Sequence, residues 1–390
     1  MIKAYKYRIY PNEEQKELFA KTFGCVRYVY NWGLKLKTTE FEENNRNVGI
    51  TELMNRMASE LKKECEWLNE VNAQSLQSAL RNLNDAYQRF FEKKACYPRF
   101  KKKKGTQTFS NPQSSSIDFK KGLLHIRKAK NIKIKIHRKF KADRIHNVII
   151  SMDSDGKYFA SILVDTYENP LPKKDICEDT TIGIDSGLNT LATCSDGRTF
   201  KAPSCFRDNE RKKILLSRRL SKKTRGSKSY ETARRRLGKL YAKGRRLHFD
   251  FLHKLTYQLT HENQVSAICV EDLNAQEFID NRKLMLIAQD ASVGRFLKFL
   301  KYKCEWYGVH YVKIGKYQPS SKTCSSCGYI KKNLKLKTRR WVCPKCGTHH
   351  DRDYNASLNI KNFGLKTLRA ERTEVKPMEC PLMDDRVIHA

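Results

Sequence analysis

The chain has 390 residues, enough for roughly two to four domains, and its 78 Lys and Arg against 42 Asp and Glu give a formal net charge of +36. This charge predicts a polyanionic partner, with nucleic acid as the first candidate and an anionic membrane surface as the competing one. The sequence has no apolar run of membrane-spanning length, no signal-peptide core and no lipidation signal, which argues against a membrane partner. Its 13 cysteines predict free thiols in a reducing compartment rather than a secreted disulfide scaffold.

The N-terminal residues alternate between apolar and basic side chains. Residues 2–10 therefore predict a half-exposed strand that Pro11 ends, and Asn12 is positioned to cap a helix that follows. Tyr28 and Tyr30 lie on this helix. Either tyrosine could contact nucleic acid, but residues of this kind more often belong to the core.

Residues 51–95 have helical periodicity, with Thr51 as a plausible N-cap. The run Lys101–Lys104 follows an aromatic stretch, so it is either a solvated loop or a contact with the nucleic-acid backbone. The period then changes to two, and residues 106–168 predict a small antiparallel β-domain with a hairpin turn at 153–157.

Residues 206–260 predict two strongly basic helices, divided by a break at 224–227. A charged face is usually only solvated, but most of the acidic partners needed for i,i+4 pairs are missing here. These helices are therefore a candidate nucleic-acid surface. A further helix is predicted at 292–307.

Three acidic residues follow or precede structured segments far apart in the chain. Asp185 ends a short apolar strand, Glu271 ends a second apolar run, and Asp353 lies in the first turn of a helix for which Asp351 is the expected N-cap. Each alone is most simply a turn or helix-dipole residue. Together they match the oxygen ligands that Mg²⁺ prefers.

Two C-x2-C pairs form the strongest motif in the sequence. The two pairs are 15 residues apart and consist of Cys324, Cys327, Cys343 and Cys346. This spacing predicts a zinc ribbon with a closed four-thiolate site, in which Gly328 and Gly347 form the tight turns. A redox role or four unpaired thiols are the weaker alternatives. His349 and His350 are possible replacement ligands, although four thiolates already complete a tetrahedron, so the zinc is expected to be structural.

Several motifs together resemble TnpB-type proteins, the orfB transposase-like proteins of insertion sequences, which are related to type V CRISPR effectors. The resemblance spans about residues 1–365 and is carried by GIDSGLNTLA, VEDLN, the cysteine ribbon and DRDYNASLNI. It implies an RNA-guided, Mg²⁺-dependent DNA endonuclease with Asp185, Glu271 and Asp353 as catalytic acids. It also implies a guide RNA and double-stranded target DNA as partners, and a cytoplasmic, nucleoid-associated protein of a bacterium or archaeon.

The implied fold class is α+β and multidomain. A RuvC-like, RNase H-fold nuclease domain carries an inserted zinc ribbon, and an N-terminal β wedge-like domain carries a helical insert. The expected division is 1–30 with 101–168 for the wedge-like domain, 31–100 for the helical recognition insert, 169–179 for a linker, 180–316 with 350–365 for the nuclease, 317–349 for the ribbon and 366–390 for a tail. Two alternatives share the charge and the cysteines: a zinc-ribbon repressor that does not cleave, and a transposase that joins strands. The sequence leaves the oligomeric state open.

Overall fold

The computed structural model folds into two compact units of mixed α and β structure. It describes residues 1–103, 105–205, 207–262, 264–272, 292–315, 318–335 and 338–371. The first unit comprises Met1–Asn169 and Thr224–Ala242, and the second comprises Pro170–Lys223 and the chain after Ala242. This agrees with the predicted α+β class. No helix in the described part of the chain is long and apolar enough to cross a membrane.

A seven-stranded antiparallel sheet forms the centre of the first unit. Its strand order is β2-β6-β7-β1-β5-β4-β3. The strands are β1 (Ile2–Tyr10), β2 (Gln107–Asn111), β3 (Ser116–Asp118), β4 (Leu123–Ile126), β5 (Ala129–Lys135), β6 (Ala142–Met152) and β7 (Tyr158–Thr166). The predicted hairpin is confirmed, because Gly156 adopts a positive φ of 80° between β6 and β7. The N-terminal strand pairs with both β7 and β5, so it completes this sheet.

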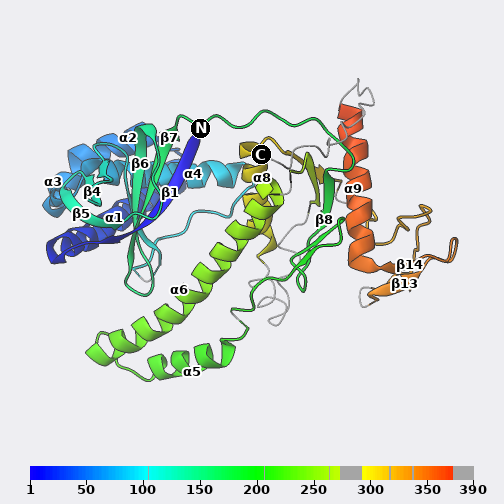
Figure 1. Ribbon diagram of the computed structural model, residues 1–390. Helices are drawn as coiled ribbons and strands as arrows, with labels where there is room; N and C mark the ends of the chain where they lie inside the picture. Colours follow the sequence, from blue (N-terminus) through cyan, green and yellow to red (C-terminus); the bar gives the residue numbers. More distant parts are fainter. Residues whose placement is uncertain are drawn as a thin grey trace. The chain divides into compact units, whose positions relative to one another are not determined.

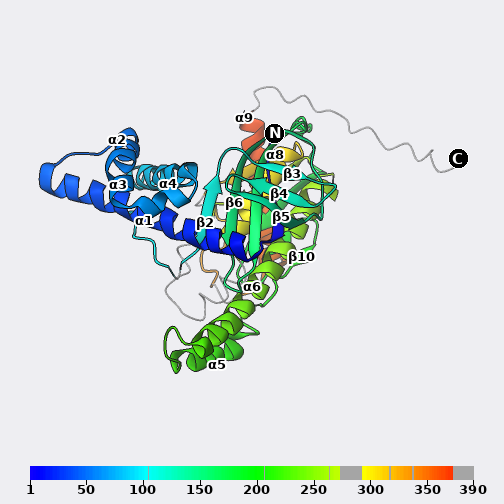
Figure 2. The same ribbon diagram turned by 90° about the vertical axis from the view of Figure 1, so that its left-hand side faces the viewer.

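Four helices accompany this sheet: α1 (Glu13–Asn44), α2 (Ile50–Arg56), α3 (Lys62–Glu64) and α4 (Ala73–Phe91). Asn12 caps α1 as predicted: its side chain accepts a hydrogen bond from the Gln15 backbone, and the Gln15 side chain accepts one from the Asn12 backbone. The prediction for Thr51 was wrong, because α2 begins at Ile50 and Gly49 is its N-cap. Phe19 of α1 packs on the rings of Phe109 and Tyr158 and so joins α1 to the sheet. Figure 2 shows α1 running alongside the strands of this sheet.

The second unit contains a five-stranded sheet of mixed direction. Its order is β10-β9-β8-β11-β12, made of β8 (Thr181–Asp185), β9 (Ala192–Cys194), β10 (Thr199–Phe200), β11 (Ala267–Glu271) and β12 (His310–Ile314). Strands β8, β11 and β12 are parallel to one another, whereas β9 and β10 are antiparallel to their neighbours. The first four residues of both β8 and β11 are buried, as expected of parallel strands covered on both faces.

Helices cover both faces of this second sheet. In the described part of this unit, the α-helices that belong to it wholly or partly are α5 (Glu210–Ser221), α6 (Lys228–Tyr257), α8 (Val293–Trp306) and α9 (Arg352–Glu371). A short ribbon pairs β13 (Arg340–Val342) with β14 (His349–Asp351). One core joins Ile184 to Phe296 of α8 and Leu252 of α6, and a separate core joins Cys269 to Ile360 of α9. Figure 1 shows α9 lying alongside β8.

Some predicted boundaries do not coincide with the observed elements. The predicted domain boundary at residue 30 falls inside α1, and α9 extends past residue 365 as far as Glu371. The segment 169–179, predicted to be a linker, is held to the second unit. Leu171 donates a backbone hydrogen bond to Trp306, and Lys174 donates one to Gly308. The rest of the predicted tail lies outside the described residues.

Two glycines allow α9 to approach the sheet at backbone distance. A Cβ added to Gly183 of β8 would lie 2.1 Å from the Ser357 carbonyl oxygen, and one added to Gly364 of α9 would lie 2.1 Å from the Cys269 Sγ atom. Neither a backbone carbonyl nor a buried side chain can move away at low cost. A side chain at either position would therefore push α9 off the sheet.

We expect Gly183→Ala to lower the free energy of unfolding by about 3 kcal/mol, the upper end of the usual cost of overpacking. Gly315→Ala is the matched control, because its added Cβ would make only an ordinary contact, 3.6 Å from Gln318 Cγ. Chemical denaturation of both variants measures the difference. Equal stability of the two variants would show that α9 does not pack this closely on β8.

Candidate metal-binding and catalytic site

The three predicted acids come together in the second unit. Val270 of β11 pairs with Ile184 of β8 in parallel register, so the next residues, Glu271 and Asp185, lie at the same edge of the sheet. Asp353 lies in the first turn of α9, the helix that packs on β8. The charges of Glu271 and Asp353 both act on the Asp185 carboxyl group.

The start of α9 explains the position of the third acid. The Asp351 side chain accepts hydrogen bonds from the backbone N–H groups of Asp353 and Tyr354, each at 3.1 Å. This confirms Asp351 as the N-cap. Because Asp351 satisfies the helix N-terminus, the Asp353 carboxylate is left available for other contacts.

The environment of Asp185 disfavours its charged form. Burial and the nearby carboxylates of Glu271 and Asp353 raise the pKa of Asp185 to about 8, although Arg352 and Arg339 act in the opposite direction. An acid surrounded by acids is stabilised as a carboxylate when a cation binds between them. Carboxylate oxygens are the ligands that hard divalent cations prefer. Among the described residues, however, the group of His, Cys, Asp or Glu whose ligand atoms all lie within 4.8 Å of one another is the four cysteines, so the three acids stay a predicted cation site.

Two residues that the sequence did not identify as site residues contact these acids. The Arg339 guanidinium donates hydrogen bonds from Nη1 to both carboxylate oxygens of Asp353, at 3.0 and 3.2 Å. The Ser320 hydroxyl donates to the Glu271 carboxylate. Arg339 is one of several basic residues between the two cysteine pairs, and nothing in the sequence distinguished it from its neighbours. Ser320 carried no signal at all.

Two buried asparagines join α9 to the segment that leads into the cysteine ribbon. The Asn359 amide donates to the carbonyl oxygens of Ser320 and Thr323, both at 2.7 Å. The Asn355 amide also donates to Thr323, at 2.7 Å, and its oxygen accepts from the Ser325 backbone at 3.0 Å. The same helix therefore carries the third acid and holds the first cysteine knuckle in place.

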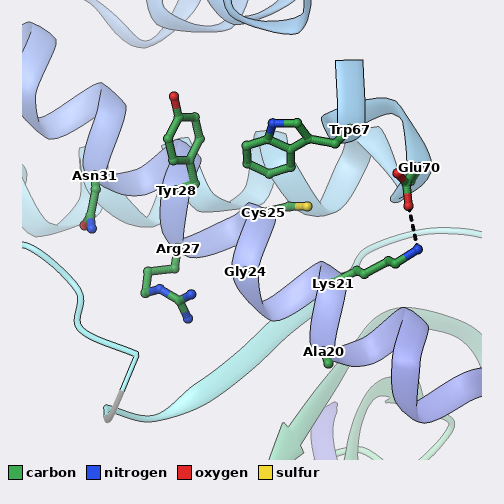
Figure 3. Close-up of a pocket in the computed structure, with 9 residues that line it drawn as sticks. All are labelled: Ala20, Lys21, Gly24, Cys25, Arg27, Tyr28, Asn31, Trp67 and Glu70. Atoms are coloured by element: carbon green, nitrogen blue, oxygen red, sulfur yellow. Dashed lines mark hydrogen bonds and ion pairs between the residues drawn. The ribbon is translucent and has the colours of Figure 1, made fainter. Parts of the chain in front are cut away.

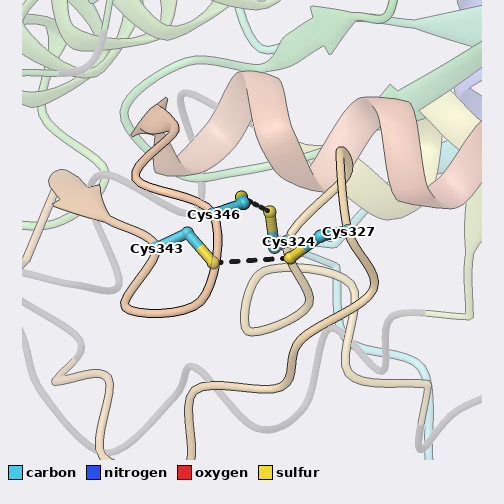
Figure 4. Close-up of side chains that lie close together, drawn as sticks. All are labelled: Cys324, Cys327, Cys343 and Cys346. Carbon is cyan, nitrogen blue, oxygen red and sulfur yellow. Dashed lines mark hydrogen bonds between the residues drawn. The ribbon is translucent and has the colours of Figure 1, made fainter.

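The four predicted zinc ligands form one compact cluster (Figure 4). All four sulfur atoms lie within 4.8 Å of one another, and the Cys324–Cys346 and Cys327–Cys343 sulfur pairs are each 3.6 Å apart. A tetrahedral zinc with Zn–S bonds of about 2.3 Å requires S–S separations of about 3.8 Å. Both the donor set and its dimensions therefore fit structural Zn²⁺.

The two knuckles have nearly the same local geometry. Gly328 and Gly347 have φ angles of 74° and 72°, and each donates a backbone hydrogen bond at 2.9 Å to the first cysteine of its knuckle. This confirms the role predicted for both glycines.

Of the two histidines considered as alternative ligands, His350 is buried and its Nε2 atom lies 3.0 Å from Cys324 Sγ.

The predicted basic helices are confirmed as α5 and α6, separated by the break at 224–227. α5 buries none of its side chains, so its cations face solvent. This helix offers a charged surface rather than a packing face, which is consistent with both alternatives, a solvated face and a nucleic-acid surface.

Three family models match different parts of the chain. One described as "Helix-turn-helix domain" matches residues 1–46, one described as "Probable transposase" matches 161–282, and one described as "Cas12f1-like, TNB domain" matches 294–360. The last of these ranges contains the cysteine cluster and Asp353. The first range folds here as β1 followed by the single helix α1.

Similar proteins cover nearly the whole chain. The chain is 35% identical over 367 residues to "Putative RNA-guided DNA endonuclease" of Streptomyces pristinaespiralis, covering 93% of this chain and 89% of the relative. It is 26% identical to "Putative RNA-guided DNA endonuclease InsQ" of Escherichia coli K12, covering 94% and 93%. Its fold is similar to that of the protein in a cryo-EM structure of a Cas12f1–sgRNA–target DNA complex, with a TM-score of 0.55 at 16% identity and coverage of 90% and 83%.

The alignment with the first of these relatives covers almost the full length of both chains, and the three family models match separate N-terminal, central and C-terminal parts of the present chain. The chain therefore belongs to the TnpB-type family, the orfB proteins of insertion sequences.

Proposed function

We propose that this protein is an RNA-guided, Mg²⁺-dependent DNA endonuclease of a transposable element. The observation that carries the proposal is the meeting of Asp185, Glu271 and Asp353 at one edge of the second sheet, in a member of this family. A repressor of the same family that does not cleave would have no need for three mutually repelling carboxylates.

The sheet of the second unit supports a RuvC-like, RNase H-type nuclease. Across the sheet, β10, β9 and β8 are antiparallel neighbours, and β11 and β12 continue parallel to β8. The strand that comes first in the chain, β8, therefore lies at the centre of the sheet, next to β11. Two acids at the ends of these central strands and a third on a covering helix are the arrangement we assign to the catalytic centre. In the first unit, we propose that the seven-stranded sheet is the wedge-like domain and that the helices after residue 30 are the recognition insert.

The three carboxylates would hold the catalytic cations. Ser320 and Arg339 orient two of these carboxylates, those of Glu271 and Asp353. Bound Mg²⁺ supplies an activated water and charge stabilisation for the leaving 3′ oxygen. Ser320 fixes the rotamer of Glu271 through its hydrogen bond. Arg339 holds Asp353 by a two-oxygen contact, and it provides a positive charge beside a site that must receive a phosphodiester.

The cysteine cluster would hold one structural Zn²⁺. Four thiolates leave no open coordination position, so we assign this zinc no chemistry on the substrate. Its role would be to fix the two knuckles, and with them the segments that carry Ser320 and Arg339.

The charge of the chain suits the proposed partners. A net charge of +36 can bind both a guide RNA and a target duplex through their phosphates. Sequence would be read by base pairing with the guide, so the protein itself requires mainly backbone contacts and a short contact with the DNA beside the target.

Co-expression of the protein with its own flanking DNA tests the proposal. The purified complex is given Mg²⁺ and a plasmid library in which a guide-matched target lies beside randomised bases. Breaks linked to one short neighbouring motif establish a guided nuclease. Bound RNA with motif-dependent binding but without breaks would support the repressor, and joined rather than broken strands would support a transposase.

The pKa of Asp185 predicts how metal binding depends on pH. The folded, metal-free protein retains a proton on Asp185 up to about pH 8, whereas the unfolded chain loses this proton near pH 4. The contribution of Asp185 to the free energy of unfolding therefore falls as the pH rises from about 4 to about 8. Mg²⁺ requires the carboxylate, and its binding below pH 8 therefore releases a proton. We expect the Mg²⁺ affinity to rise by up to about tenfold per pH unit below pH 8 and then to level off, as measured by calorimetry.

Arg339 is expected to lower the midpoint of this pH dependence, as a smaller contribution than those of burial and the neighbouring acids. Its charge lowers the pKa of Asp185, so Arg339→Ala should move the midpoint to higher pH, whereas Arg339→Lys retains the charge and should move it less. Lys345→Ala, which removes an exposed cation from the second knuckle, is the control. The same midpoint in Arg339→Ala and in the control would contradict the effect.

A further inference from the structure

The first unit contains an open hollow of about 440 Å³ on α1, well away in sequence from the three acids (Figure 3). Its wall and floor come from α1, and the short helical turn Glu66–Glu70 closes one side. Gly24 lies in the middle, with Tyr28 and Trp67 on one side of α1 and Arg27 on the other. The volume lies within the range of small-ligand pockets, about 300–1,000 Å³.

Two large aromatic side chains in this hollow are exposed. Tyr28 is 40% exposed and Trp67 is 42% exposed, and their rings meet edge to face at 5.1 Å. The sequence left open whether Tyr28 and Tyr30 belong to the core. Tyr30 is buried, at 5% exposed, but Tyr28 is not. Exposed aromatic faces of this kind are the usual stacking surfaces for unpaired bases.

The floor of the hollow is open and uncharged. A Cβ added at Gly24 would approach only the Arg27 guanidinium, at 4.0 Å, so the glycine leaves space above the helix. Cys25 is buried beside it, and burial raises the pKa of its thiol to about 11, which keeps it neutral. On the rim, Glu70 is paired with Lys21 at 2.8 Å, so its negative charge is compensated.

A second, basic hollow of about 260 Å³ adjoins the first. Arg27 lines both, and Lys101 and Lys102 line only the second. Asn31 of the first hollow fixes Lys101 in place: its side chain donates to the Lys101 carbonyl oxygen at 3.0 Å and accepts from the Lys101 backbone N–H at 2.8 Å. Arg27 hydrogen-bonds the neutral Gln107 side chain, at 3.3 Å, and pairs with no carboxylate among the residues the structure describes. Its positive charge is therefore available to an anion.

We propose that the two hollows form one site for an unpaired nucleotide of a bound nucleic acid. The base stacks on Tyr28 and Trp67, and the phosphate binds Arg27 and Lys102, whereas the Lys101 ammonium lies over the buried Tyr30 ring, 3.8 Å from its centroid. An aromatic surface next to a group of cations is the combination that binds single-stranded nucleic acid without reading its sequence. The inference rests on the proposed function, because the nucleotide belongs either to the guide RNA or to a separated strand of the target DNA.

Affinity measurements on four variants test the site in the full-length protein. Trp67→Ala and Arg27→Ala each remove one half of it, Trp67→Phe retains an aromatic ring, and Phe41→Ala removes an exposed aromatic from the same helix outside the hollow. The dissociation constant is measured first for the guide RNA and then, with the guide bound, for target DNA. We expect Trp67→Ala and Arg27→Ala to weaken binding of one of the two by about tenfold or more, the range expected for one stacked base. Trp67→Phe should retain most of the affinity and Phe41→Ala all of it.

A loss confined to the RNA measurement assigns the nucleotide to the guide, and a loss confined to DNA assigns it to the target. Ultraviolet cross-linking of the wild-type complex provides a measurement that does not depend on any variant folding, and the expected adducts lie on peptides that contain Tyr28 or Trp67. If both Trp67→Ala and Arg27→Ala bind RNA and DNA with wild-type affinity, and no such adducts form, the proposed site is wrong. Guided cleavage by the wild-type protein would in that case still support the proposed function. Failure of the wild-type protein to bind either nucleic acid would overturn both.

Discussion

Asp185→Ala is expected to abolish DNA cleavage while leaving nucleic-acid binding unchanged. Asp185 is the last residue of the central strand β8, and the charges of Glu271 and Asp353 both act on its carboxyl group. Its loss therefore removes a ligand that the proposed cations share. Metal-ion stabilisation of a transition state is worth several kcal/mol, which corresponds to about a thousandfold or more in rate. Single-turnover cleavage of a guide-matched duplex measures the rate, and a binding assay on the same preparation measures affinity.

Asp272→Ala is the matched control for this experiment. Asp272 directly follows Glu271, one of the proposed catalytic acids, but its exposed carboxylate pairs with Lys313 at 2.6 Å. A surface pair of this kind contributes little, so we expect cleavage within about twofold of the wild type. Substantial cleavage by Asp185→Ala, or loss of RNA and DNA binding in it, would contradict the role given to this acid.

Cys324→Ser is expected to abolish binding of the proposed zinc and with it the nuclease activity. Zinc in ribbons and fingers contributes folding free energy directly, about 10–16 kcal/mol in isolated peptides. Without zinc the two knuckles lose their common centre. Arg339, which lies between the knuckles, then loses its fixed position on Asp353. Elemental analysis should fall from one zinc per chain to almost none, and guided cleavage should fall with it.

The exposed Cys96, which lies outside the cluster, provides the control, and Cys96→Ser should retain both zinc and cleavage. His350 makes the outcome for Cys324 more informative, because its Nε2 atom is 3.0 Å from the sulfur that is removed. If Cys324→Ser keeps its zinc, the double variant with His350→Ala decides whether the imidazole has taken the vacant place. Zinc retained by the double variant would show that the four cysteines are not the site.

The sequence identified the acids because each is next to a strongly patterned segment. Asp185 and Glu271 end apolar runs, and Asp351 precedes a helical pattern that places Asp353 one turn inside. Local patterns of this kind are set by burial and by backbone hydrogen bonding, which depend on nearby residues. The cysteine knuckles were equally readable, because metal geometry fixes their spacing.

Features that depend on remote packing could not be read in the same way. Nothing near Gly183 indicates that a helix about 170 residues later will lie against it, and Ser320 resembles any loop serine. Tyr28 and Tyr30 have the same sequence context, yet only Tyr30 is buried, because they point to different sides of α1. The helix start at Thr51 was wrong for a local reason: Gly49 adopts the extended N-cap conformation one residue before the helix, which then begins at Ile50.

The close packing of α9 on the sheet also has a consequence for synthesis of the chain on the ribosome. β8 and β11 are complete once residue 271 has emerged, but the helix that covers Cys269, Val312 and Ile314 consists of residues 352–371. Until then, the nascent nuclease exposes one apolar face of its sheet and lacks its third carboxylate. A chain that stops before Arg352 would therefore be both catalytically incomplete and a target for chaperones and proteases, so unfinished copies of the nuclease would be removed before they could cut DNA.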